Sequence, residues 1–312
     1  MRTDGVAVAR QRSPLPTVGW LELHLGTRVE ISCRAEQRNA GEAAVQDAFA
    51  EIQNIHQLMS FHLPDSDVSR LNRRAAREVV TVDPRTVKVV RAACELSRQS
   101  QGHFDCTTAA ELVGDGHLPR PVSCDAPDPN ASWQDIEVLS DDTVSFRRPL
   151  WLDLGGIAKG FAVDRALHRC LAGEVKACLV NAGGDCRVSD ALTASVTLDV
   201  PGQRNDQAAT IQLSGGSLAS SCAGPGDGMR ESAKAGPHYD GRRRRPLNKS
   251  IFATVLSEDC MIADALTKVV LCLGDEAAPI LARWRATAFL FNADSGWKQL
   301  PAPRSAWRKA HG

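Results

Sequence analysis

The sequence has no excess of charge of either sign. Lysine and arginine together number 37, and so do aspartate and glutamate, in a chain of 312 residues. A chain without net charge has no general attraction to nucleic acid or to an anionic membrane surface. Aromatic residues are also scarce, at 5%, which leaves few rings for stacking on bases. We therefore expect no nucleic-acid partner, and an anionic ligand must be held by a local group of cations.

Long apolar segments are missing as well. No stretch approaches the roughly 18 uninterrupted apolar residues that predict a transmembrane helix. Residues 1–20 contain neither the apolar core of a signal peptide nor a cysteine for lipid attachment. We therefore expect a cytoplasmic protein without a transmembrane segment, or a periplasmic one if the start codon is misassigned. Residues 1–18 and 301–312 are expected to be flexible tails around one domain over residues 19–300.

Cysteine is present ten times, but without a metal-binding or redox pattern. The sequence contains no CxxC pair and no zinc-finger spacing. Several cysteines lie in apolar segments, where a small buried thiol fits. This usage indicates a reducing environment rather than a set of disulfides.

Two common nucleotide-binding patterns are absent too. The sequence has neither GxGxxG nor GxxxxGK[ST], which argues against a Rossmann dinucleotide site and against a P-loop. The predicted strands and helices are mixed without strict alternation. We therefore predict an α+β fold, in which a mixed or antiparallel sheet with flanking helices forms a single compact domain.

Apolar spacing predicts the main elements. Alternation predicts two short strands around Gly26-Thr27 within residues 20–33. A period of 3.6 residues predicts helices over residues 41–60, 82–105 and 261–274.

Turn and cap residues predict where these elements stop. Residues 113–133 are rich in Gly, Pro, Asp and Asn and are expected to form a long surface loop. Residues 59–72 should form a second loop, in which Ser66 or Asp67 caps the next helix. The pair Asp83-Pro84 is a good start for the helix that follows.

Three segments run from apolar residues into a pair of glycines. They are LDLGGIAKGFAVDRA (152–166), LVNAGGDCRV (179–188) and IQLSGGSLASS (211–221). Each is predicted as a strand that ends in a glycine turn, and the first turn leads into a helix. Glycine permits positive φ and a close approach of the backbone, as the diphosphate of a cofactor requires. Any one pair taken alone is more often a simple turn.

A lysine, Lys159, lies in the first turn of the helix predicted after the first glycine pair. A cation at this position opposes the positive end of the helix dipole, so a negative charge should lie beside it. Asp153, Asp164 or a bound anion could supply that charge.

The segments LDLGGIAKGFAVDRA, LVNAGGDCRV and MIADALTKVVLCLG, in this order, resemble the ApbE family, the FAD:protein FMN transferases. Shorter matches include MSFHLPDSDVSRLN (59–72), GHFDCTT (102–108) and PHYDGRRRRP (237–246), and the resemblance covers residues 20–275. It implies an ApbE-like (T-fold-like) domain. It also implies an enzyme that splits the diphosphate of FAD with the help of Mg²⁺, joins FMN to a threonine or serine of an acceptor protein and releases AMP. The acceptor is expected to be a redox protein.

The resemblance also implies which residues contact FAD. Carried over by position, they are Leu25, His62, Phe104, Asp105, Asp153, Lys159 and His238. Alternatives stay open for three of them. Asp105 could cap a helix instead, His62 could be a solvated loop residue, and Lys159 could belong to a structural ion pair.

The metal ligands and the catalytic residues follow in the same way. The resemblance assigns Mg²⁺ to the Gly156 carbonyl, Asp264 and Thr267. It makes His238 and Asp264 the catalytic residues, His238 for proton transfer or phosphate binding. Lys268 stands where the family has a threonine ligand, and an ammonium cannot bind a metal. Three possibilities remain: Asp264 holds the metal with carbonyls and waters, Lys268 supplies positive charge in its place, or the site is inactive.

The segment PHYDGRRRRP also departs from the family pattern. Asp240 comes one position early, and Gly241 replaces a proline. The four arginines 242–245 would ordinarily be a solvated surface run, but they could also steady a diphosphate or attract an acidic acceptor protein. Two other functions therefore stay open: a non-catalytic flavin carrier that binds FAD, and an Mg²⁺-dependent FAD pyrophosphatase that yields FMN and AMP.

Overall fold

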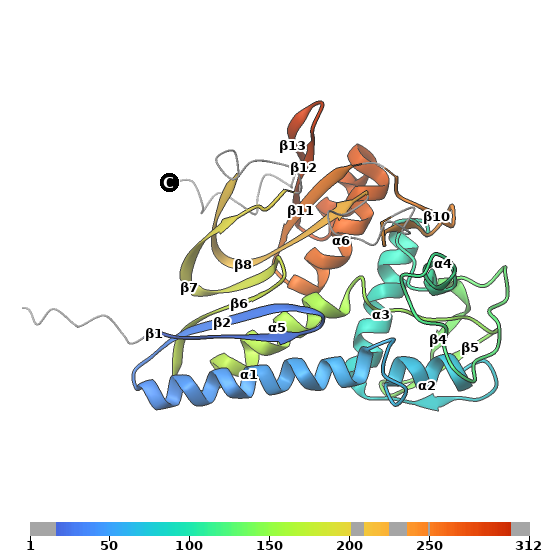
Figure 1. The fold of residues 1–312 in the computed structure, drawn as a ribbon, viewed down its shortest axis with the longest axis horizontal. Coiled ribbons are helices and arrows are strands. Elements are labelled where there is room, and N and C mark those ends of the chain that lie inside the picture. The colour runs from blue at the N-terminus through green and yellow to red at the C-terminus, as the bar shows by residue number, and fades with distance from the viewer. Residues whose placement is uncertain (1–16, 201–208, 225–235, 249, 301–312) are drawn as a thin grey trace, which may run out of the picture.

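The largest sheet of the fold has eight antiparallel strands (Figure 1). The computed structural model describes residues 17–200, 209–224, 236–248 and 250–300. The strand order is β1-β2-β6-β7-β8-β11-β12-β13. The strands are β1 (Thr17–His24), β2 (Thr27–Ala35), β6 (Val175–Ala182), β7 (Asp185–Thr197), β8 (Thr210–Ala223), β11 (Ile251–Ser257), β12 (Thr287–Asn292) and β13 (Gly296–Leu300).

Three helices pack on one face of this sheet. They are α1 (Arg38–Met59), α5 (Ala158–Leu171) and α6 (Cys260–Leu273), and α5 lies between the other two. Val45, Phe49 and Ile52 are buried along one face of α1, at the spacing that predicted this helix. The sheet supplies alternate buried residues such as Val29 and Ile31 of β2. The main core therefore lies between the sheet and these helices.

A smaller part of the fold lies beyond the C-terminal end of α1 (Figure 1). It contains a three-stranded sheet in the order β3-β5-β4 and three helices. Its elements are α2 (Asp67–Arg74), β3 (Val80–Thr81), α3 (Pro84–Gln99), α4 (Ala109–Gly114), β4 (Ile136–Val138) and β5 (Thr143–Phe146). Two short strands, β9 (Tyr239–Asp240) and β10 (Arg245–Pro246), one short helix, α7 (Ala278–Arg283), and two 3-10 helices, η1 (Trp133–Asp135) and η3 (Gly274–Ala277), complete the described elements. The α+β prediction is confirmed, and the main sheet is wholly antiparallel.

Several predicted boundaries are confirmed by the contacts that set them. Ser66 caps α2 by accepting a hydrogen bond from the Ser69 N–H. Asp83 caps α3 in the same way through the Arg85 N–H at 2.8 Å. Helix α6 ends at Gly274, where φ is 55°.

The strand predicted immediately before Gly155-Gly156 is wrong. Residues 151–154 belong to no strand and no sheet. The side-chain amide of Asn72 takes the place of a neighbouring strand, since it accepts from the Leu152 N–H at 2.7 Å and donates to the Leu152 carbonyl at 3.0 Å. The Asp153 N–H then donates to the Cys106 carbonyl at 2.8 Å. Polar partners of this kind satisfy a buried backbone without a ladder.

The third glycine pair is also placed differently from the prediction. Gly215 and Gly216 lie inside β8 rather than at its end, and both have positive φ. The pairing of β7 with β8 slips at this point, between Val188 and Thr193. The pair therefore allows a bulge in a long strand.

The predicted N-terminal tail is two residues too long, because β1 begins at Thr17 and Val18 is buried. The rest of both predicted tails lies outside the described residues. Within those that are described, no helix combines the length and apolarity needed to cross a membrane.

Candidate functional site

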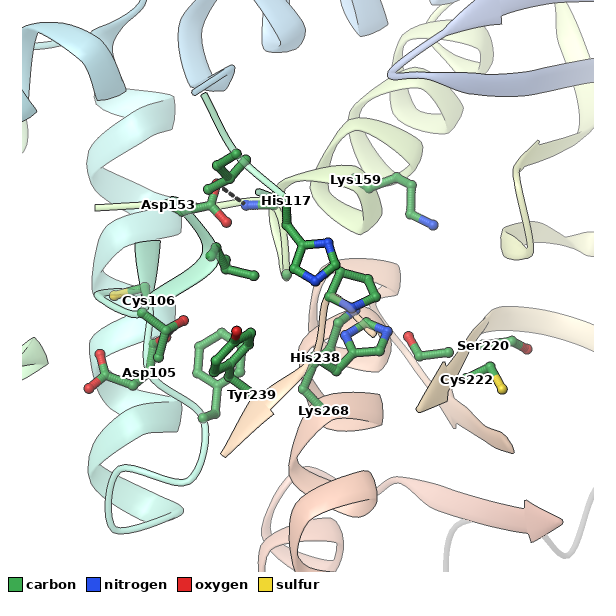
Figure 2. A pocket seen from close by; sticks show the side chains of 18 residues that line it. Asp105, Cys106, His117, Asp153, Lys159, Ser220, Cys222, His238, Tyr239 and Lys268 are labelled. Atoms are coloured by element: carbon green, nitrogen blue, oxygen red, sulfur yellow. Dashed lines mark hydrogen bonds between the residues drawn. The ribbon is translucent and has the colours of Figure 1, made fainter. Parts of the chain in front are cut away.

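Segments far apart in the sequence meet around a cavity of about 460 Å³ (Figure 2). The segment after α3, the start of α5, the end of β8, the residues before β9 and one turn of α6 all contribute to its wall. The predicted residues that line it are Phe104, Asp105, Asp153, Gly156, Lys159 and His238. Lys268 lines it as well, while Asp264 and Thr267 are buried in α6 just behind it. The structure thus brings most of the predicted site together.

Two of the predicted FAD contacts are not among the residues that line this cavity. Leu25 forms the turn between β1 and β2 with φ of 53°, and its side chain packs against the main core. His62 lines a separate, smaller cavity of about 150 Å³ together with Arg73. Their roles in binding FAD stay predictions.

Helices α5 and α6 cross in direct backbone contact, and this crossing positions the site. A Cβ atom at Gly160 would lie 2.3 Å from the Cys260 carbonyl oxygen, so only glycine fits there. The closeness lets Asp264 Oδ2 accept a hydrogen bond from the Gly160 N–H at 3.1 Å. In return, Asp164 accepts from the N–H groups of Cys260 and Met261, both at 2.9 Å. Each carboxylate therefore lies at the positive end of the other's helix.

The negative charge beside Lys159 is Asp185. Its Oδ2 lies 3.1 Å from the Lys159 ammonium, in an ion pair without hydrogen-bond geometry. Neither of the two aspartates suggested by the sequence has this role. Asp153 accepts from the Gly155 N–H at 3.1 Å, and Asp164 pairs with Arg187.

Asp185 is fully buried, and neither carboxylate oxygen has a hydrogen-bond partner among the described residues. Burial, and after it the nearby charge of Asp264, raise the pKa of Asp185 to about 7, against the opposing effect of Lys159 and Lys268. Burial by itself would lower the pKa of Lys159, but the charges of Asp185 and Asp264 outweigh it and raise that pKa.

Sequence reasoning missed Asp185 as a site residue. The signal that could have found it is its position directly after Gly183-Gly184, at the start of β7. If a glycine turn brings the backbone close to a ligand, the side chain of the residue that follows the turn also lies near that ligand.

Lys268 engages the residues that were predicted to hold a metal. Its ammonium bonds to Asp264 Oδ1 and lies 3.0 Å from the Asp264 carbonyl oxygen. Its Cε lies 3.8 Å from where a Cβ of Gly156 would be. The Thr267 hydroxyl donates to the Asp264 carbonyl at 2.7 Å and is 2.8 Å from the Ser221 hydroxyl.

As arranged, this donor set does not fit magnesium, which is bound by carboxylate, water and phosphate oxygens in a nearly octahedral shell, because the Lys268 ammonium already lies on the Asp264 side chain and carbonyl. Both carboxylate oxygens of Asp264 already accept hydrogen bonds, one of them from an ammonium. No group of three or more His, Cys, Asp or Glu side chains that could hold a metal occurs in the part of the chain that the structure describes.

His238 faces the cavity as a neutral imidazole. Burial, followed by the positive charge of Lys268, lowers the pKa of His238 to about 3, although Asp264 acts in the opposite direction. A neutral ring has one nitrogen that can accept a proton. His238 therefore has the protonation state of a proton acceptor.

The segment predicted as a surface loop over residues 113–133 contributes to the site. His117 and Leu118 line the cavity, and His117 Nε2 is buried without a hydrogen-bond partner among the described residues. Figure 2 shows the His117 and His238 side chains around the same space. His117 could not be predicted as a site residue, because the composition of a loop rich in Gly and Pro does not indicate which of its side chains point into a cavity.

Three of the four arginines, Arg242, Arg243 and Arg245, are exposed, as expected of a surface run, and only Arg244 is partly buried. Arg244 donates to the carbonyls of Thr107 at 2.9 Å and Ala131 at 2.6 Å. Arg243 pairs with Asp240 at 2.9 Å. None of the four arginines, all of them described, lines the cavity. Arg244 therefore fastens the β9–β10 segment to the residues before α4, and the suggested contact of the run with a diphosphate is not supported.

Asp105 lines the cavity but does not cap a helix, because α4 has Thr108 at its N-cap position and no side-chain cap. Its Oδ1 accepts from the Thr107 N–H at 2.8 Å and from the Thr107 hydroxyl at 2.7 Å. Burial raises the pKa of Asp105, although Arg244 at 3.6 Å acts against it.

Comparison with known proteins agrees with this geometry. The profile of the ApbE family matches residues 25–291. The FAD:protein FMN transferase of Vibrio cholerae is 28% identical over 269 residues, which are 80% of this chain and 79% of that protein. The protein of the same name from Haemophilus influenzae is 25% identical over 282 residues, 82% of this chain and 80% of that protein.

Solved structures share the fold. The structure of the flavin transferase ApbE from Vibrio cholerae aligns with a TM-score of 0.75 at 22% identity, covering 94% of this chain and 98% of the other. That of the ApbE protein from Thermotoga maritima aligns with a TM-score of 0.75 at 22% identity, covering 91% and 97%. Gly155-Gly156, Lys159, Lys268 and His238 lie around one cavity. Because the family profile also matches over most of its length, the chain belongs to the ApbE family.

Proposed function

We propose that this protein is an FAD:protein FMN transferase, which moves FMN from FAD to a threonine or serine hydroxyl of an acceptor protein. The observation that carries the proposal is the meeting of Lys159, Lys268 and the neutral His238 at one cavity. Two cations suit a diphosphate, and a neutral imidazole suits a hydroxyl that must lose its proton. Membership of the ApbE family and the names of the relatives support the same activity.

In this proposal FAD lies with its diphosphate beside the two ammonium groups. Phe104 offers an apolar contact for a ring of the cofactor, and Asp105 and Asp153 offer carboxylates for its N–H or hydroxyl groups. In the free protein, the negative charge that stabilises the Lys159 ammonium in the first turn of α5 is Asp185. In the complex, the diphosphate adds a second negative charge beside it.

The chemistry is a single displacement at phosphorus. The acceptor hydroxyl gives its proton to His238 while its oxygen bonds to the phosphorus of the FMN half. The bond from this phosphorus to the bridging oxygen breaks, and AMP leaves with that oxygen. Lys159 and Lys268 offset the charge on the phosphate oxygens in the transition state. Bound phosphate charge also raises the pKa of His238, which strengthens it as a base.

Asp264 acts in this scheme by holding Lys268 toward the cavity. It is fully buried and does not line the cavity, so it does not reach the hydroxyl proton. The resemblance also implied Mg²⁺ at Gly156, Asp264 and Thr267, but these residues do not fit the ion as arranged, and we assign no step to it. The expected cytoplasmic location stays a prediction.

Incubation of the purified protein with FAD and an acceptor protein bearing a surface threonine tests the function. The expected result is flavin fluorescence covalently attached to the acceptor, with one AMP released for each flavin attached. FMN and AMP without attachment would instead identify a pyrophosphatase, and bound but unchanged FAD would identify a carrier. In the variant His238→Gln, transfer should be lost while FAD remains bound.

A further inference from the structure

We propose that the Lys268 ammonium takes the place of a divalent cation, so that this protein binds the diphosphate of FAD without magnesium. The inference deepens the proposed function and rests on it, since it concerns the same cavity. The observation behind it is that the oxygen atoms assigned to a metal ion already have other partners.

Lys268 fills the space between the groups that a metal would join. Its ammonium lies on the Asp264 side chain and carbonyl, and its Cε packs near Gly156. These are the carboxylate and the backbone segment that the family resemblance assigns to the ion. The side chain reaches them because residue 268 follows Asp264 by one helical turn, on the same face of α6.

The Thr267 hydroxyl and the second carboxylate oxygen of Asp264 have other partners. Thr267 turns its hydroxyl back to the Asp264 carbonyl and toward Ser221. Asp264 Oδ2 accepts from the Gly160 N–H. A divalent ion would therefore have to displace an ammonium and leave it without its carboxylate partner in a largely buried position, where Lys268 is 15% exposed.

The charge balance of the site favours an anionic ligand without a metal. Lys159 lies beside Asp185, and Lys268 lies beside Asp264. Lys159 and Lys268 line the cavity, whereas Asp185 and Asp264 are fully buried and do not line it. A diphosphate in the cavity therefore meets the two lysines rather than the two carboxylates.

Equilibrium dialysis of the unmodified protein with FAD tests the inference without any mutation. The affinity in excess EDTA should equal that in excess MgCl₂ within about a factor of two. Binding that appears only with MgCl₂ would overturn the inference and leave the proposed function standing. The absence of FAD binding under both conditions would overturn both.

Two variants of residue 268 separate charge from metal binding. Lys268→Thr removes the ammonium and adds an oxygen ligand, so FAD affinity in EDTA should fall at least about tenfold and MgCl₂ should restore it. Lys268→Met removes the charge without adding a ligand, so the loss should persist with MgCl₂. Lys298→Thr is the matched control, because Lys298 is exposed and pairs with Asp275 on the surface.

Calorimetric titration with MgCl₂ alone gives a readout that does not depend on FAD. The unmodified protein should release or absorb no binding heat, whereas Lys268→Thr should bind the ion. Thermal unfolding of each variant identifies any that fail to fold. Magnesium binding by the unmodified protein, or an Lys268→Thr variant whose FAD affinity is unchanged in EDTA, would overturn the inference.

Discussion

Asp164 and Asp264 each cap the helix that carries the other. Asp164, on α5, accepts from the first N–H groups of α6, and Asp264, on α6, accepts from the Gly160 N–H in the first turn of α5. A carboxylate is stabilised at a helix N-terminus by the orphan N–H groups and by the dipole. This exchange fixes how α5 and α6 cross, and with it the relative positions of Lys159 and Lys268.

Asp164→Ala should therefore destabilise the protein strongly. The change removes the acceptor of two buried N–H groups and one carboxylate partner of Arg187, which is 13% exposed. We expect the free energy of unfolding, measured in urea, to fall by about 3–5 kcal/mol. The control is Asp47→Ala, which removes an exposed partner of Arg169 and should change little. A loss in Asp164→Ala as small as in this control would contradict the capping role.

The close crossing predicts that Gly160 cannot be replaced. In Gly160→Ala the new Cβ would meet the Cys260 backbone, which cannot move aside as a side chain can. We expect a loss of about 1–3 kcal/mol in unfolding free energy, together with weaker FAD binding as the two lysines separate. Gly114→Ala is a matched control, since it is also helical and has open space around it. Equal stability of the two variants would sink this account.

The neutral state of His238 predicts a pH dependence of stability. With a folded pKa of about 3, below its ordinary value of 6.5, the ring binds a proton in the unfolded chain but not in the native one between these values. Above pH 6.5 the ring is neutral in both states, so His238 does not lower the free energy of unfolding. As the pH falls from 6.5 toward 3, the free energy of unfolding decreases by up to about 1.4 kcal/mol per pH unit. Denaturation of His238→Gln across this range should show a shallower dependence than the unmodified protein. Parallel curves for the two proteins would argue against a neutral His238.

Replacement of Lys159 distinguishes its binding role from its structural one. Lys159→Met should weaken FAD binding about 10–100-fold, the effect of one charge-assisted contact, and should also leave Asp185 buried without its ion partner. The double variant Lys159→Met/Asp185→Asn removes the orphaned charge, so it should recover stability but not affinity. Dialysis and urea denaturation measure the two effects separately, with exposed Lys176→Met as the control. Recovery of FAD affinity in the double variant would mean that Lys159 acts only through Asp185.

Local signals in the sequence predicted most elements, because these depend on neighbours within a few residues. Helix α1 follows from its apolar period, and α2 and α3 begin at the caps Ser66 and Asp83. The strand expected before Gly155 failed for the opposite reason. The backbone of Leu152 is satisfied by Asn72, a side chain from a distant helix that no local pattern reveals.

The sequence by itself determined the α+β class, the family motifs and the group of candidate residues, since periodicity, caps and glycine turns are properties of short segments. Only the tertiary structure decided how their charges pair. Lys159 forms an ion pair with Asp185 of β7, although Asp153 and Asp164 are nearer in the sequence. Lys268 forms an ion pair with Asp264. The reason is that an ion pair depends on where two separately formed elements come together, which here is set by the packing of α5 against α6 and the sheet.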